Sequence, residues 1–383
     1  MKISVIGAGY AGLSSALLLS RHHLNRITVY DRFDRVQTIG AGILIQPSAI
    51  EILKKLGLYE QLIDHGEKVY HLEGINHRRR QVFLTSYDDY SPNSFGIGIH
   101  RSLLFQSLYD KCKIQSNITF QLSREITSLA DLQVTNDLVI VASGSHSKLR
   151  EQVPIKQTYQ PYPYGCLWTT IEDNEIARHR LCQYLRYSQE MFGILPSGLN
   201  HNSKRIVSVF WSLPTRLKTT YSLENVLERM KYYLNDTHSD FFEKLKQANY
   251  SFAIYGDVYM QRYDHENLVF IGDAAHAMSP QLGQGANMAL IDSYFLDKSL
   301  QEHNDDVRIA LQMYTHMRRR HLRFYSQASK FLTPLYQSDR QIYGRFRDLM
   351  FTISKQIKFS RRMSSEILCG KRISWIRNKE IEY

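Results

Sequence analysis

The sequence lacks long hydrophobic runs, clustered cysteines, internal repeats and low-complexity segments. No apolar stretch of the 383-residue chain approaches the roughly 18 residues that a membrane-spanning helix needs. The first residues do not resemble a signal peptide, because glycines interrupt a short apolar core. The four cysteines lie far apart, without CxxC or zinc-ligand spacing. We therefore expect a cytoplasmic protein with neither a disulfide scaffold nor a bound metal.

The composition is otherwise ordinary, apart from an excess of positive charge. Hydrophobic residues make up 43% and charged residues 22% of the chain, which is typical of a globular protein, and the length suits two domains. The net charge is +11, and residues 341–383 contain ten Lys or Arg against four Asp or Glu. Such a basic tail is compatible with a membrane-surface contact or an acidic partner. We favour a solvated helical face, and we expect no nucleic-acid partner.

The N-terminus has the pattern of a dinucleotide-binding unit. A strand, a glycine-rich turn, a helix and a second strand are predicted at residues 2–6, 7–12, 13–19 and 27–30. In the turn, Gly7 permits a tight bend, Gly9 lets a pyrophosphate approach the backbone, and Gly12 lets the helix pack on the strand. Asp31 follows the second strand, about 20 residues after Gly12, where a carboxylate can bind ribose hydroxyls. The alternative is a glycine-rich turn without a ligand.

A second strand–loop–helix unit lies at residues 268–292, and the rest of the chain is organised around it. Four apolar residues from Leu268 form a short buried strand, Gly272-Asp273 ends it, and a glycine-rich loop leads into a helix predicted from Ala286. Helix N-terminal amides point at whatever occupies such a loop, so the unit suits a phosphate or cofactor. An ordinary strand–helix connection is the alternative, but a second unit of this kind in one chain argues against it.

Three segments between these units complete the pattern. Gly40 and Gly42 either let their loop lie close to a flat ligand or serve as simple turn residues. A helix is predicted from Pro47 to Gly57. Arg101 begins another helix, where a cation is unfavourable for the helix dipole. Arg101 therefore either binds an anionic ligand or is an ordinary surface arginine.

The remaining segments differ in character. Residues 138–142 form another apolar strand, which leads into Ser143-Gly144. Residues 151–260 are rich in tyrosine and alternate as in an antiparallel sheet. After Asp292 the chain is predicted to be mostly helical.

Together, three motifs resemble those of the FAD-dependent monooxygenases of the aromatic-hydroxylase type, which have the para-hydroxybenzoate hydroxylase fold. The relatives include salicylate hydroxylase-like enzymes, ubiquinone-pathway hydroxylases and tetracycline-inactivating monooxygenases. The first motif is the N-terminal glycine turn with Asp31, and the second is Ser143-Gly144 with Ser147 and Arg150. The third is Gly272-Asp273 with the P-x-x-G-x-G loop that follows it. Ser143 departs from the family, which usually has aspartate there.

The resemblance implies a set of FAD-binding residues. The adenosine end of FAD is expected at the N-terminal turn, the ribityl chain at Asp273, and the isoalloxazine ring beside the loop that follows. The implied cofactor-binding residues are Gly7, Gly9, Ala11, Gly12, Asp31, Arg32, Gly42, Gln46, Arg101, Asp273, Pro280, Gly283, Gly285, Ala286 and Asn287. No catalytic residue is identified, and His276 is interpreted as structural.

The expected fold is α/β, with a Rossmann-like FAD-binding domain, an inserted substrate domain built on a mixed or antiparallel sheet, and a C-terminal helical segment. The FAD-binding domain is predicted to comprise residues 1–67, 99–150 and 261–330. The substrate domain is predicted to comprise residues 68–98 and 151–260, and the helical segment residues 331–383.

The resemblance also implies the activity. NADPH or NADH is expected to reduce FAD, and reduced FAD is expected to react with O2 to give a C4a-hydroperoxyflavin. This species would hydroxylate an aromatic, phenolic or quinone-like small molecule. One alternative is a flavin-dependent reductase or oxidase that inserts no oxygen. The other is a non-enzymatic nucleotide-fold protein, which the intact Asp273 loop argues against.

Overall fold

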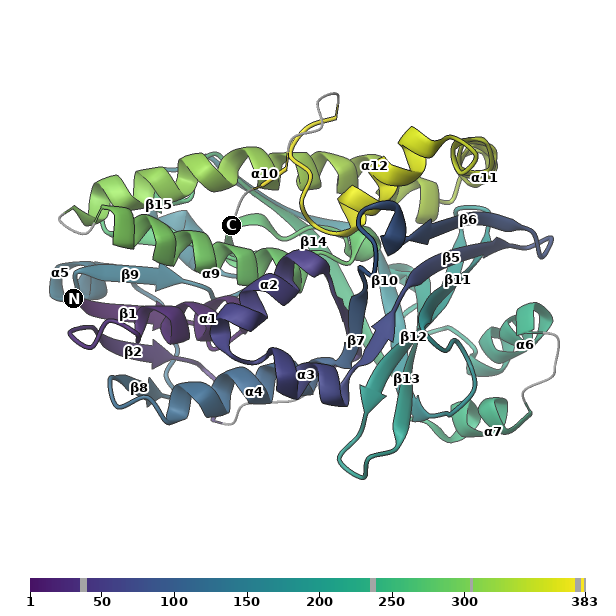
Figure 1. The fold of residues 1–383 in the computed structure, drawn as a ribbon, viewed down its shortest axis with the longest axis horizontal. Coiled ribbons are helices and arrows are strands. Elements are labelled where there is room, and N and C mark those ends of the chain that lie inside the picture. The colour runs from purple at the N-terminus through teal and green to yellow at the C-terminus, as the bar shows by residue number, and fades with distance from the viewer. Residues whose placement is uncertain (35–39, 235–238, 304–305, 376–379, 382–383) are drawn as a thin grey trace.

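A mainly parallel sheet at the N-terminal end holds both glycine-rich units (Figure 1). The computed structural model describes residues 1–34, 40–234, 239–303, 306–375 and 380–381. The strands of this sheet are, in spatial order, β15 (Asp264–His265), β16 (Leu268–Phe270), β9 (Leu138–Val141), β1 (Lys2–Ile6), β2 (Arg26–Tyr30) and β8 (Ile118–Gln121). All neighbours run parallel except β15 and β16. The strands β9 and β16 are continuous apolar runs, and β1 is buried from Ile3 to Ile6, as in a parallel sheet that helices cover on both faces.

A group of helices lies on or beside this sheet, and its first and last members begin within the two glycine-rich units. These helices are α1 (Tyr10–Leu19), α2 (Pro47–Leu56), α3 (Tyr59–His65), α4 (Arg101–Lys113), α5 (Ala130–Thr135) and α9 (Gly285–Glu302). The helix α1 contacts both α4 and α9, so it joins the two glycine-rich units. As predicted, α2 begins at Pro47 and ends before Gly57, which adopts the left-handed conformation that terminates helices.

A second, seven-stranded sheet occupies the other side of the molecule (Figure 1). Its strands are, in spatial order, β14 (Ser251–Met260), β10 (Gln157–Glu172), β13 (Arg205–Pro214), β12 (Glu190–Leu199), β11 (Arg180–Arg186), β5 (His71–Asn76) and β6 (Gln81–Ser86). Only β5 and β11 pair in parallel, so the sheet is mixed, as predicted. The helices α6 (Leu223–Leu234) and α7 (Ser239–Gln247) close an aromatic core on it, where Phe192 and Trp211 stack at 5.2 Å.

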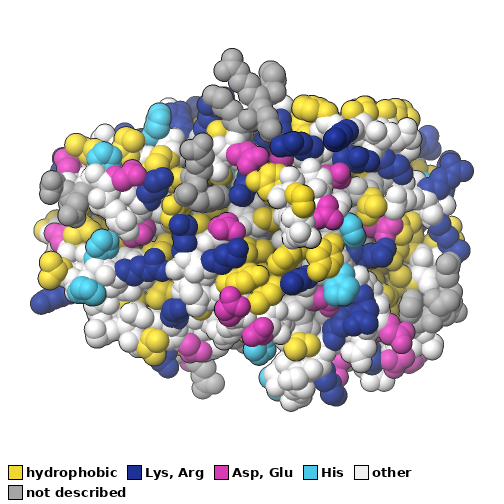
Figure 2. Space-filling model, viewed as in Figure 1, with side chains coloured by type: hydrophobic (Ala, Val, Ile, Leu, Met, Phe, Trp, Pro, Cys, Tyr) yellow, Lys and Arg dark blue, Asp and Glu magenta, His cyan; other side chains and the backbone are white. Residues whose placement is uncertain are grey.

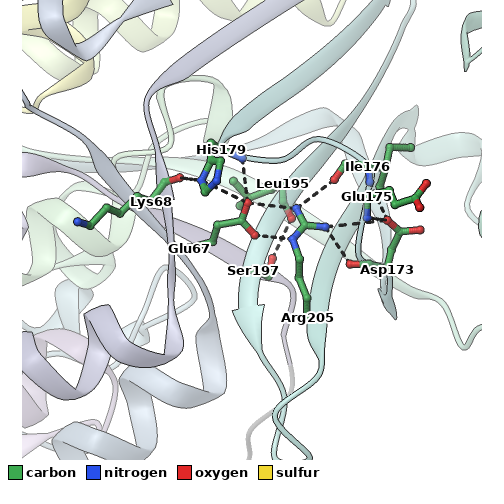
Figure 3. A network of polar contacts seen from close by, with 9 residues as sticks. All are labelled: Glu67, Lys68, Asp173, Glu175, Ile176, His179, Leu195, Ser197 and Arg205. Atoms are coloured by element: carbon green, nitrogen blue, oxygen red, sulfur yellow. Dashed lines mark hydrogen bonds and ion pairs between the residues drawn. The ribbon is translucent and has the colours of Figure 1, made fainter.

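A small antiparallel sheet and an ion-pair network connect the two halves. The small sheet contains β3 (Gly42–Ile45), β7 (Gly96–His100) and β4 (Glu67–Val69), and it packs on β12. Arg205 of β13 donates to both carboxylate oxygens of Glu67, at 2.6 and 3.2 Å, and to the Asp173 carbonyl at 2.8 Å (Figure 3). The His179 amide also donates to Glu67, at 2.8 Å. Because both charges are nearly buried and fully hydrogen-bonded, the pair fixes the position of β4 on the large sheet.

The chain ends in three helices, α10 (Val307–Tyr336), α11 (Gln341–Ser354) and α12 (Lys358–Leu368). The predicted α/β architecture with an inserted mixed sheet and a C-terminal helical segment is therefore confirmed, while the residue limits of the domains stay a prediction. None of the helices within the described ranges is long and apolar enough to cross a membrane. The four cysteines are buried and free.

Candidate cofactor site

Four turns converge at the carboxyl edge of the parallel sheet. Gly7 follows β1, Asp31 follows β2, Ser143 follows β9 and Gly272 closely follows β16. The chain adds strands on one side of β1 and then crosses to the other side with β9, so the sheet has its topological switch point between these two strands. Ligands of open α/β sheets bind in the crevice outside such a point.

The N-terminal turn has the geometry that its glycines predict. Gly7 has a φ of +106°, and a Cβ there would lie 2.5 Å from the Ala142 carbonyl oxygen. A Cβ at Gly12 would overlap the Gly7 carbonyl, so this glycine lets α1 pack on the turn. Gly9 differs, because nothing lies within 4 Å of its Cβ position. Two glycines therefore serve packing, and the third faces open space.

Asp31 is tied to the same turn. One carboxylate oxygen accepts from the Ala8 amide at 2.7 Å, and the other accepts from the Phe33 amide at 3.0 Å. A carboxylate offers about four acceptor positions, so Asp31 keeps capacity for further donors such as ribose hydroxyls. Arg32 is exposed, and its guanidinium lies 4.9 Å from the Phe33 ring centroid.

The Gly272-Asp273 turn packs directly on the first unit. A Cβ at Gly272 would lie 2.9 Å from the Ala11 Cβ, so Ala11 serves packing between the units. Asp273 begins the one-turn helix α8 (Asp273–His276), and its side chain is solvent-accessible although protein surrounds it. This enclosure raises the pKa of Asp273, while His276 and Arg101 act in the opposite direction. The carboxylate is thus an accessible acceptor inside a recess.

The loop after α8 contains glycines whose Cβ positions face open space. Pro280 starts a single 3₁₀ turn, and Gly283 ends it with a φ of +61°. Nothing lies within 4 Å of the Cβ positions of Gly283 and Gly144, and at Gly285 only the Asp273 Oδ1 does, at 3.9 Å. Gly285 and Ala286 form the first turn of α9, whose N-terminus has no side-chain cap, so its amides are available to a ligand.

Asn287 and Gln46 form a buried clamp beneath this loop. The Asn287 Oδ1 accepts from the Gln46 amide at 2.9 Å, and its Nδ2 donates to the Gly283 carbonyl at 3.0 Å and the Leu44 carbonyl at 3.3 Å. Tyr87 donates to the Gln46 Oε1 at 2.6 Å. The Gln46 Nε2 is buried and has no partner among the described residues. Asn287 therefore positions the loop, and Gln46 retains one free donor.

Arg101 lies across the loop that precedes β3. A Cβ at Gly40 would overlap the Arg101 side chain, and one at Gly42 would overlap the Ser197 hydroxyl. The Gly42 amide donates to the Ser208 Oγ at 2.6 Å. These two glycines therefore make room for Arg101 and for the large sheet, and a contact of Gly42 with a cofactor stays a prediction. Tyr10 donates to the Arg101 carbonyl at 2.9 Å, which joins α1 to α4.

The serine-containing turn after β9 is held by Arg150. The Arg150 guanidinium is buried and donates to the Ser145 carbonyl at 2.7 Å and to the Ala274 carbonyl at 2.9 Å. It thus connects this turn to α8. Ser143 Oγ lies 2.6 Å from Ser147 Oγ, so the position where the resemblance implies an aspartate has a neutral hydroxyl pair.

A buried charge network supports the second turn, and the sequence did not predict it. Asp292 of α9 accepts from the Gly272 amide at 2.8 Å, from His276 Nε2 at 2.5 Å and from Arg318 Nε at 2.7 Å. Burial opposes its ionisation, but His276 and Arg318 hold the pKa of Asp292 well below its ordinary value. His276 thus holds this turn through its hydrogen bond to Asp292, and its interpretation as a purely structural residue stays a prediction. Arg318 is fully buried.

The network extends to the C-terminal segment through His321. Arg318 Nη1 lies 2.6 Å from His321 Nδ1, and His321 Nε2 lies 2.9 Å from the Gly370 carbonyl oxygen. Since arginine can only donate, Nδ1 accepts and Nε2 carries the proton of a neutral imidazole. Burial, reinforced by the Arg318 cation, holds the pKa of His321 well below its ordinary value. One chain of contacts thus connects Gly272 with Gly370.

The residues at this edge fit the diphosphate and ribose groups of FAD. Uncapped N-termini of α1 and α9 supply amides, three glycines face open space, and Asp31 and Asp273 supply acceptors at separate turns. In the described part of the chain, no cluster of three or more His, Cys, Asp or Glu side chains suits a metal ion.

Comparison with known proteins agrees with this geometry. The sequence matches the family described as FAD binding domain over residues 1–328. The chain belongs to this family. It is 24% identical over 332 residues to the FAD-dependent monooxygenase olcE of Penicillium canescens, covering 76% of this chain and 69% of olcE. The predicted resemblance is thereby confirmed, since relatives such as olcE are named FAD-dependent monooxygenases, which are oxidoreductase enzymes.

Two solved structures share the fold. Pseudomonas aeruginosa PqsL in complex with 2-aminobenzoylacetate has a TM-score of 0.77 and 17% identity, covering 90% of this chain and 99% of PqsL. The tetrameric form of 2-methyl-3-hydroxypyridine-5-carboxylic acid oxygenase has a TM-score of 0.73 and 18% identity, covering 91% of this chain and 97% of the oxygenase.

We predict that His321 makes stability depend on pH. Its pKa is low in the folded protein but near 6.5 in the unfolded chain, so the unfolded state binds one more proton below that value. The free energy of unfolding should therefore fall as the pH drops below 6.5, by up to about 1.4 kcal/mol per pH unit for this group. Urea unfolding from pH 7 to pH 5 should show a smaller slope for His321→Gln than for wild type. His23→Gln, at an exposed position, should keep the wild-type slope, and an unchanged slope in His321→Gln would contradict the prediction.

Proposed function

We propose that the protein binds FAD along the carboxyl edge of the parallel sheet, with the adenosine ribose at Asp31 and the isoalloxazine ring beside residues 283–287. The observation that carries this proposal is the set of glycines at Gly9, Gly144 and Gly283, where a Cβ would meet nothing within 4 Å. Gly9 and Gly144 lie at turns of the sheet edge, and Gly283 lies just before α9, so the three positions suit an elongated ligand. Family membership supports FAD as that ligand.

The remaining predicted residues fall into two roles under this proposal. Asp31 and Asp273 would bind FAD hydroxyls directly. Ala11 and Asn287 would act by position, because one packs the two turns together and the other clamps the ring-side loop. The unpartnered Gln46 Nε2 would donate to the cofactor, and the Arg101 cation would face its diphosphate or ribityl portion.

The chemistry follows from the cofactor and the elements around it. Bound FAD supplies the capacity to accept a hydride from NADPH or NADH and to activate O2. The N-terminus of α9 would stabilise negative charge on the ring through its free amides and its dipole. The clamp of Asn287 and Gln46 would keep these amides oriented. We assign no acid or base catalyst to the chain.

We propose that the substrate is an aromatic, phenolic or quinone-like small molecule that one oxygen atom of O2 hydroxylates. The fold similarity to PqsL, which was solved with 2-aminobenzoylacetate, supports this class. The pocket would lie between the FAD loop and the large sheet, since Gly42 bonds to Ser208 of β13. Ser143 would leave nicotinamide reduction without the carboxylate that relatives carry at this turn.

The glycines provide a test of FAD binding. Gly9 has an extended backbone with φ −81° and open space at its Cβ position, so Gly9→Ala should change the stability of FAD-free protein by only about 1 kcal/mol or less. The added methyl group should nevertheless reduce FAD affinity at least about tenfold, a change of about 1.4 kcal/mol. Titration of apoprotein with FAD measures this. Gly12→Ala should instead impair folding itself, and unchanged FAD affinity in Gly9→Ala would contradict the site.

The oxygen-insertion step has its own test. The FAD-loaded protein is incubated with NADPH or NADH and with aromatic, phenolic and quinone-like compounds under ¹⁸O2, and products are analysed by mass spectrometry. We expect at least one compound to accelerate nicotinamide oxidation and to gain one ¹⁸O atom. Accelerated oxidation that yields only hydrogen peroxide, with no labelled product from any compound, would favour the reductase or oxidase alternative.

A further inference from the structure

The helix α11 exposes its apolar residues rather than burying them. Ile342, Phe346, Leu349 and Ile353 are 63%, 52%, 63% and 55% exposed. Their spacing of four, three and four residues places them on one helical face. The opposite face contacts the protein through Gly344 and Arg347, which are buried. A surface helix of a globular protein normally has the reverse pattern.

Neighbouring elements extend this face into a continuous surface. Phe331 of α10 is 52% exposed, and together with α11 it lines a groove of about 710 Å³. Ile357, the residue before α12, and Phe359, in the first turn of α12, are 51% and 62% exposed. We call the residues Phe331, Ile342, Phe346, Leu349 and Ile353 the α11 patch. Clustered exposed apolar side chains of this size mark an interaction surface more often than chance.

The side chains around the α11 patch are predominantly cationic. Lys330 and Arg345 line the same groove and are exposed, and the exposed Lys358 begins the next helix, α12. Within the described residues 341–375 no acidic side chain is fully exposed, because Glu366 is buried and Asp348 is half-buried against Arg347 at 2.7 Å. Figure 2 shows hydrophobic side chains along the upper-right edge, where Figure 1 places α11, with Lys and Arg side chains beside them. Three charged residues of the predicted basic tail, Arg377, Lys379 and Glu382, lie outside the described residues.

We propose that the α11 patch rests on the surface of an anionic phospholipid bilayer. Its aliphatic and aromatic side chains would enter the boundary between headgroups and acyl chains, and the flanking cations would face lipid phosphates and carboxylates. Amphipathic helices with basic flanks bind membranes in this way without crossing them. This proposal differs from the sequence-based prediction for the basic tail, which favoured a solvated helical face.

A second copy of the chain fits the same surface less well. In a twofold dimer each patch meets itself, so the cations at Lys330, Arg345 and Lys358 would face like charges. Neither α11 nor α12 has an exposed acidic side chain to offset them, and the exposed Asp339 just before α11 is paired with Arg216 at 3.3 Å. Charge complementarity therefore favours the anionic bilayer.

The test is co-sedimentation of the full-length protein with vesicles of phosphatidylcholine, with and without phosphatidylserine. We expect binding only to vesicles that contain phosphatidylserine, and weaker binding at high salt, because the ionic contribution is screened. The double variants Phe346→Ser/Leu349→Ser and Arg345→Glu/Lys358→Glu should each reduce the vesicle partition coefficient about tenfold or more.

The control variant is Ile114→Ser/Val134→Ser, which removes apolar residues that are 78% and 87% exposed elsewhere on the surface. It should bind vesicles like wild type. Thermal unfolding of each variant verifies its fold, and light scattering measures its mass. The proposal is overturned if wild type does not bind phosphatidylserine vesicles at low salt, or if the patch variants bind as well as the control. It is also overturned if wild type is a dimer that the patch variants dissociate.

Discussion

The site depends on the hydrogen bonds that the buried Asp292 carboxylate accepts. This carboxylate accepts hydrogen bonds from Gly272, His276 and Arg318, and through Arg318 and His321 it reaches Gly370. Removing one partner would leave a buried charge without compensation, which typically costs about 3–5 kcal/mol. The turn that presents Asp273 is therefore held by α9, α10 and the C-terminal segment together, although these elements lie far apart in the sequence.

A second constraint is the close packing of the two glycine-rich units. Within the first unit Gly12 packs against Gly7, and Gly272 of the second unit packs against Ala11 of the first, so the two units are in direct contact. Gly9, Gly144 and Gly283 differ from these packed positions, because nothing lies within 4 Å of their Cβ positions. At these three glycines a ligand could approach the backbone closely.

Local backbone motifs could be predicted from the sequence, whereas polar contacts between residues far apart in the chain could not. The glycine turns, the strands before them and the helix from Pro47 to Gly57 follow from local rules and are present. Arg318 is one of three consecutive arginines in the sequence, and nothing in that local pattern shows that it is buried beside Asp292. Its position on the same helical face as Leu311 and Tyr314 is the signal that could have identified it. The clamp between Asn287 and Gln46 joins residues too distant for any spacing rule.

The most direct test of this account is a crystal structure of the FAD-loaded protein. The account predicts that Asp31 lies within hydrogen-bond distance of the adenosine ribose and that the diphosphate passes Gly9. It also predicts that Asp273 contacts the ribityl chain and that the isoalloxazine ring lies beside Gly283 and the start of α9. FAD bound away from this edge, with Gly9 and Gly283 still facing solvent, would contradict it.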